Sequence, residues 1–145
     1  MLRSILATDA SLAPILLRLA VAAVILPHGL QKTFGWFGGY GPKATLGYFN
    51  SIGVPTLLGA LVIAAEVLGP LALVAGAGTR IAALVLAAVM AVAALRVHAV
   101  HGFFMNWGGT QKGEGLEFFV VLVAAAVALV VTGAGALSVD HGLTR

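Results

Sequence analysis

The sequence predicts an all-α membrane protein: a four-transmembrane-helix bundle with aromatic and glycine-rich loops on one face. Three observations support this fold class. Of the 145 residues, 61% are hydrophobic and only 9% are charged, whereas a soluble domain carries about 25% charged residues. Four apolar runs each approach the ~20 residues that a helix needs to cross a bilayer. None of them alternates as a strand does, and a spanning segment must satisfy its own backbone hydrogen bonds.

The predicted spans belong to a single membrane domain, residues 1–145, and cover about residues 12–30, 54–77, 81–100 and 116–132. The first run is predicted to be a retained span rather than a signal peptide, because Asp9, Pro14 and Arg18 interrupt any signal-peptide core.

Two aromatic, glycine-rich loops join the spans, at residues 33–42 and 101–109. In a bundle of four spans both loops lie on the same side, opposite the termini and the tight turn at 76–80. Tryptophan and tyrosine favour the headgroup zone of a bilayer, and a short interfacial helix is predicted at 43–49. Cationic residues are nearly balanced between the two sides, so the positive-inside rule assigns no orientation. They are Arg3, Arg80 and Arg145 on the terminal side, and Lys32, Lys43, Arg96 and Lys112 on the other.

Composition excludes several kinds of function. The chain has no cysteine, so it forms no disulfide, thiolate metal site or dithiol relay. Its net charge of +3 is small and scattered, which does not indicate a nucleic-acid partner. His98 and His101 with nearby carboxylates form too weak a ligand pattern to predict a metal site. No intrinsic cofactor is expected, and any electrons must come from a partner or a bound cofactor.

Glu66 lies in the middle of the second apolar run. An ionised carboxylate at mid-bilayer depth costs at least a few kcal/mol unless it is paired, protonated or beside water. At the helical rise, Arg18 lies about 9 Å and Glu66 about 16 Å from the terminal side of the membrane. An ion pair between these two residues is therefore predicted as the simplest explanation of both charges. A structural pair and a functional acid both remain open.

Polar residues also gather near the loop-side membrane face. Arg18, His28 and Lys32 share one side of the first span, and we expect that side to face protein, because facing lipid would be costly. Glu66 and Glu117 are candidate proton relays. The layer near the loops comprises His28, Lys32, Arg96, His98, His101, Glu114 and Glu117. The candidate ligand-binding residues are Arg18, His28, Lys32, Trp36, Glu66, Arg96, His98, His101, Phe104, Trp107 and Glu117.

Several ordered motifs match one family along nearly the whole chain. They are Leu17-Arg18-Leu19, His28-Gly29-Leu30-Gln31-Lys32, Glu66-Val67-Leu68-Gly69, Gly115-Leu116-Glu117-Phe118 and the segment Gly133 to Asp140. The chain resembles the DoxX family of small bacterial membrane proteins, although Ala134 replaces the proline of the family's final motif. The resemblance implies a four-helix membrane fold and a link to oxidoreductase systems. Those systems include thiosulfate–quinone oxidoreduction, terminal quinol oxidation and redox-stress complexes.

Three functions compete at this point. The first is a membrane subunit of an oxidoreductase that binds a quinone or similar amphiphile and works with a redox partner protein. The aromatic loops would then gate the headgroup. The second is a small-solute, proton or lipid-binding transport protein, and the third is an assembly scaffold without catalysis. Glu66→Gln would be tolerated by a scaffold but not by a proton relay. We expect a multi-pass protein of the bacterial inner membrane that forms homo-oligomers, because four spans make a thin bundle.

Overall fold

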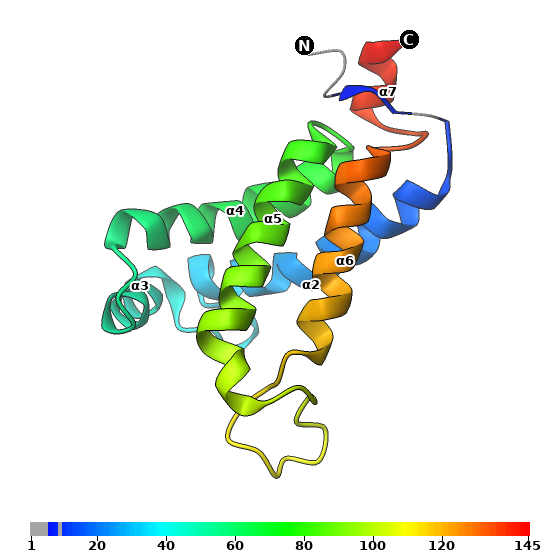
Figure 1. Cartoon of the computed structure of the whole chain (residues 1–145). Helices are drawn as coiled ribbons and strands as arrows, with labels where there is room; N and C mark the ends of the chain where they lie inside the picture. Colours follow the sequence, from blue (N-terminus) through cyan, green and yellow to red (C-terminus); the bar gives the residue numbers. More distant parts are fainter. Residues whose placement is uncertain (1–5, 9) are drawn as a thin grey trace.

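The computed structural model describes residues 6–8 and 10–145. Arg3 and Asp9, which entered the predictions on orientation and on the first span, lie outside the described residues. The described chain is helical and contains no strand, and its helices run as two long antiparallel pairs (Figure 1). The long helices are α2 (Ala13–Phe34), α4 (Thr56–Ala75), α5 (Thr79–Ala93) and α6 (Glu117–Thr132). The short ones are η1 (Trp36–Gly38), α3 (Gly41–Ser51), η2 (Ala94–His98), η3 (Ala99–His101) and α7 (Val139–Thr144).

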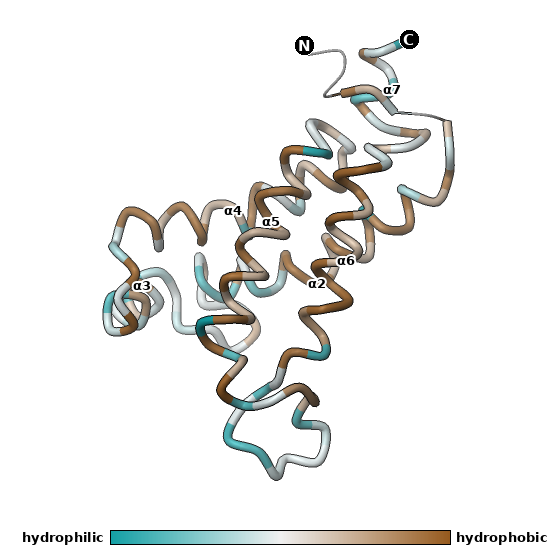
Figure 2. Tube along the Cα trace, in the orientation of Figure 1, coloured by the Kyte–Doolittle hydropathy of each residue, from teal (hydrophilic) through white to brown (hydrophobic). Residues whose placement is uncertain are grey.

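Three of these helices are long and apolar enough to cross a membrane. They are α2, α4 and the continuous stretch Thr79–His101, with 22, 20 and 23 residues. Helix α6 is equally apolar but has 16 residues, about 24 Å of rise against a hydrocarbon core of about 30 Å. Hydrophobic residues follow the long helices, and polar ones gather at their ends and in the connections (Figure 2). The predicted all-α membrane bundle is confirmed.

The core lies where the two helix pairs meet. Helix α2 packs mainly on α4 and α5 mainly on α6, and contacts of α4 with α5 and of α2 with α6 join the pairs. The buried core residues include Val21, Ile25, Leu73, Leu86 and Leu129. The pairs converge near the termini and diverge toward the loops, so α3 and the loop 102–116 lie at the tips of different pairs (Figure 1).

Local sequence explains where the helices end. Helix α2 stops at Gly35 and α4 at Gly76, which have φ values of 71° and 65°, a left-handed conformation that glycine adopts without steric cost. Helix α3 contains the short helix predicted at 43–49, and its position at the membrane interface stays a prediction. Helix α5 continues into a five-residue π-helical turn, η2, that carries Arg96 and His98. Such wide turns are common at functional sites.

The C-terminal segment closes the terminal end of the bundle. The two carboxylate oxygens of Asp140 accept hydrogen bonds from the backbone N–H groups of Gly78 (2.7 Å) and Thr79 (2.9 Å) at the start of α5. The Asp140 N–H in turn donates to the Gly76 carbonyl at 2.9 Å. An anion at a helix N-terminus satisfies free N–H groups and complements the helix dipole. Asp140 thus caps α5 from the far end of the chain.

Arg18 lies at this terminal end of the bundle, beside Gly76 and Leu137. Its side chain is 2% exposed, and Nη2 donates to the carbonyl of Leu137 at 3.2 Å. Asp140 is the acidic group whose charge acts on Arg18. A Cβ added to Gly76 would lie 1.7 Å from Nη1 of Arg18, so the guanidinium needs glycine there. The C-terminal segment therefore accepts one hydrogen bond from the buried cation, whose Nε and Nη1 atoms have no hydrogen-bond partner among the described residues.

We expect Asp140→Ala to destabilise the protein by about 2 kcal/mol, because it removes the cap of α5 and the negative charge that acts on Arg18. The measurement is unfolding in detergent followed by circular dichroism. His141→Ala, on the same short helix, is the matched control and should unfold like the wild type. If both variants unfold alike, Asp140 does not have this role.

Candidate functional site

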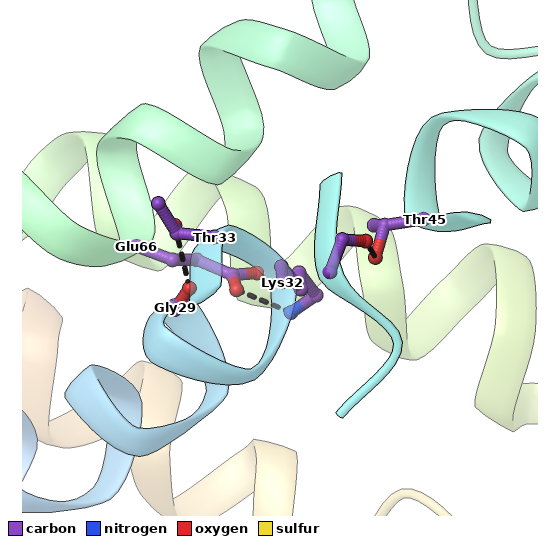
Figure 3. A network of polar contacts seen from close by, with 6 residues as sticks. Gly29, Lys32, Thr33, Thr45 and Glu66 are labelled. Atoms are coloured by element: carbon purple, nitrogen blue, oxygen red, sulfur yellow. Dashed lines mark hydrogen bonds and ion pairs between the residues drawn. The ribbon is translucent and has the colours of Figure 1, made fainter. Parts of the chain in front are cut away.

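Glu66 and Lys32 form a buried ion pair between α2 and α4. The Lys32 Nζ contacts Oε2 of Glu66 within hydrogen-bonding distance, and Figure 3 shows the lysine reaching from α2 to this carboxylate. The Glu66 side chain is 4% exposed and that of Lys32 is 26% exposed. The Glu66 carboxylate is therefore enclosed by protein, and the Lys32 side chain is partly exposed.

A close approach of two backbones brings the pair together. A Cβ added to Gly29 would lie 2.3 Å from the carbonyl oxygen of Glu66, so only glycine allows α2 to approach α4 so closely. Lys32 lies one turn further along α2 and reaches back to Glu66 from there. Thr33 Oγ1 donates to the Gly29 carbonyl at 2.8 Å and satisfies a polar group beside the contact (Figure 3).

The predicted ion pair between Arg18 and Glu66 is wrong. The two helices are antiparallel, with Gly29 opposite Glu66 and Arg18 opposite Gly76. Glu66 and Gly76 are ten residues apart on α4, so Arg18 lies about 15 Å along the helix pair from Glu66. The prediction estimated depth from the ends of the apolar runs, and this placed the two charges too close together.

A pocket of about 350 Å³ opens beside Lys32. It is formed by the end of α2, the turn after it and helix α3, which folds back against α2 and α4. Its lining is mostly apolar and aromatic, and Lys32 is the only charged residue among the described residues that line it. The lining consists of Gln31, Lys32, Gly39, Tyr40, Ala44, Thr45, Tyr48 and Phe49. This volume is at the lower end of the range for small-ligand sites.

Short polar contacts fix the walls of this pocket. Gln31 Nε2 donates to the carbonyl of Phe37 at 3.2 Å, which ties α2 to the following turn. Thr45 Oγ1 donates to the Gly41 carbonyl at 2.7 Å in the first turn of α3. A Cβ on Gly39 would lie 2.5 Å from atoms of Gln31. The glycines of the first aromatic loop therefore let the chain press against α2 and form the pocket.

The second aromatic loop holds a separate polar cluster. Glu117 Oε2 accepts from the N–H of Met105 at 3.1 Å, and Glu114 Oε2 from that of Asn106 at 2.7 Å. His98 Nδ1 lies 2.9 Å from the Glu114 carbonyl. Helix α6 begins at Glu117, so Glu114 precedes the helix. These two carboxylates hold the loop in place through hydrogen bonds to its backbone. The proton-relay role of Glu117 stays a prediction.

The predicted polar layer is not continuous in the structure. Among the described residues, no hydrogen bond or ion pair connects the Lys32–Glu66 pair with the loop 102–116 or with η2. His28 and Arg96 are exposed, and His98 and His101 are half-buried. The aromatic candidates Trp36, Phe104 and Trp107 are exposed. The described chain holds no group of three or more histidines or acids that could bind a metal ion.

The expectation that His28 faces protein is wrong. It lies about 80° around the helix from Arg18, and the neighbouring helices do not cover that angle. Tyr40, Tyr48 and Phe49 were missed as pocket residues, because hydropathy does not show that the predicted helix at 43–49 folds back over Lys32. The two adjacent aromatic residues Tyr48 and Phe49, at the end of a helix with no other aromatic residue, are the signal that could have suggested this packing.

Comparison with known proteins agrees with this architecture. The sequence model of the DoxX family matches residues 13–99, more than half of the chain. The chain belongs to the DoxX family. It is also similar to "Putative oxidoreductase CatD" of Bacillus subtilis (strain 168), at 28% identity over 126 residues, covering 87% of this chain and 83% of that protein. No solved structure matches the chain.

The family match includes both partners of the ion pair and the pocket beside them, and it ends before the loop 102–116. These comparisons associate this DoxX membrane protein with oxidoreductases. The Lys32–Glu66 pair and its pocket are therefore the candidate functional site.

We expect Lys32→Met to lower the free energy of unfolding by about 3 kcal/mol, because it leaves an enclosed carboxylate without its partner. The double variant Lys32→Met, Glu66→Met should recover most of this loss, since apolar residues tolerate burial. Unfolding of the three proteins in detergent measures both effects. Equal losses in the single and double variants would show that the two side chains do not interact.

Proposed function

We propose that this protein is a membrane subunit of an oxidoreductase system that binds a quinone headgroup in the pocket beside Lys32. The observation that carries the proposal is that Lys32, paired with Glu66, lines an aromatic pocket at the loop-side end of α2. A quinone needs an apolar slot for its ring, a donor to its carbonyl and a source of protons. Tyr48 and Phe49 offer the slot, and Lys32 offers the donor.

The ion pair suits proton transfer as well as binding. Reduction of a quinone to a quinol takes two electrons and two protons and forms two O–H bonds. Lys32 would donate a hydrogen bond to one carbonyl oxygen and transfer its proton as charge develops there, and Glu66 would stabilise the ammonium that is restored afterwards. The second proton, and the proton that restores the Lys32 ammonium, would come from water at the pocket opening.

The electrons must come from outside this chain. The chain has no cysteine and so no dithiol that could supply them, and we propose a redox partner protein as their source, with this subunit providing the quinone site. We place the protein in the bacterial inner membrane, where quinones are dissolved, and expect it to form homo-oligomers there. The likeness to the Bacillus subtilis protein named as an oxidoreductase supports the redox assignment.

Quenching of Trp36 fluorescence tests quinone binding directly. Trp36 begins the turn that forms one wall of the pocket, and the chain has two tryptophans, so Trp107→Phe leaves it as a single reporter. A short-chain benzoquinone should quench it saturably in detergent. Adding Lys32→Met should weaken binding about tenfold or more, the effect of losing a hydrogen bond from a charged donor.

Lys43→Met is the matched control, because Lys43 is an exposed cation on α3 that does not line the pocket. It should bind the quinone as the reporter protein does. Quenching that never saturates, or that Lys32→Met leaves unchanged, would contradict a quinone site here. Retention of a phospholipid in its place, seen by native mass spectrometry, would favour the lipid-binding alternative.

A further inference from the structure

The pocket beside Lys32 is lined by a single charge that is already balanced. Lys32 is the only charged residue among the described residues of its lining, and Glu66 contacts the ammonium from the protein side. The Glu66 side chain is 4% exposed, so it has little access to water that could stabilise it alone. A ligand in the pocket therefore meets a cation whose charge is already compensated.

This arrangement treats neutral and anionic headgroups differently. A neutral carbonyl oxygen can accept one of the remaining N–H groups of the ammonium while Lys32 keeps its contact with Glu66. A phosphate would compete with Glu66 for the same ammonium. It would then either leave an enclosed carboxylate unpaired or bring two anions onto one cation, and both outcomes are unfavourable at membrane depth.

We propose that Glu66 determines the specificity of this pocket: it admits amphiphiles with a neutral polar headgroup and excludes the anionic phospholipids that surround the protein. This inference rests on the proposed function in taking the pocket as a ligand site. It adds a reason for an acid in the middle of α4, since an unpaired Lys32 would attract the abundant anionic lipids. Glu66 determines the specificity indirectly, because it compensates the charge of Lys32, which meets the headgroup.

Two probes in native mass spectrometry test the proposal, a short-chain benzoquinone and phosphatidylglycerol, each added to the full-length protein in a nonionic detergent. In the wild type, phosphatidylglycerol should not displace the quinone. In Glu66→Gln the unpaired ammonium should bind phosphatidylglycerol about tenfold more tightly than the wild type does, a change of about 1.4 kcal/mol. Addition of Lys32→Met to Glu66→Gln should abolish the gain.

Glu114→Gln is the matched control, because it removes the same charge from an exposed position away from the pocket lining. It should bind phosphatidylglycerol as the wild type does. Displacement of the quinone by phosphatidylglycerol in the wild type would overturn the proposal without any variant, so the test does not depend on the folding of Glu66→Gln.

The failure of this inference can be told from the failure of the proposed function. A wild type that binds the quinone, with no lipid gain in Glu66→Gln, overturns the specificity role of Glu66 and leaves the quinone site in place. A wild type that binds no quinone, with a lipid gain that requires Lys32, removes the quinone site and supports charge compensation by Glu66.

Discussion

The structure depends on the neutralisation of one carboxylate inside the membrane. Glu66 lies at the centre of α4, and Lys32 from the end of α2 provides its counter-charge. This pairing requires α2 to approach α4 at Gly29, where a side chain would collide with the Glu66 backbone. It also holds the end of α2 in place, and the first aromatic loop and α3 build the pocket on that end. The ion pair, the glycine contact and the pocket are thus parts of one local arrangement.

The two buried charges Glu66 and Arg18 lie at different levels of the bundle and have different surroundings. Glu66 is balanced by Lys32, whereas Arg18 lies among Gly76, Leu137 and the charge of Asp140 at the terminal end. Glu66 and Arg18 therefore do not pair with each other across the apolar interior, where both charges would be desolvated. The consequence for function is that the chemistry concentrates at one place, beside Lys32, while the terminal end serves stability.

Much of the fold follows from hydropathy, because crossing a bilayer dictates the length and helicity of each apolar run. The same reasoning identified Glu66, Arg18 and Lys32 as residues that need an explanation. It paired Glu66 with Arg18, whereas the structure pairs Glu66 with Lys32. The register of α2 on α4 is fixed by the close approaches at Gly29 and Gly76, and distances counted from estimated span ends do not contain that information. The exposure of His28 and the return of α3 over Lys32 depend on helix crossing and loop geometry, which a periodicity argument does not include.

The most direct test of this account is solid-state NMR of the protein in bilayers, measuring dipolar couplings between lysine ¹⁵Nζ and glutamate ¹³Cδ atoms. The chain has only three lysines, at positions 32, 43 and 112, and three glutamates, at 66, 114 and 117, so single substitutions assign every signal. The account predicts a strong coupling between Lys32 and Glu66 that disappears in Lys32→Met. The absence of a Lys32–Glu66 coupling in the wild type would contradict the register, the position of the ion pair and the site built on it.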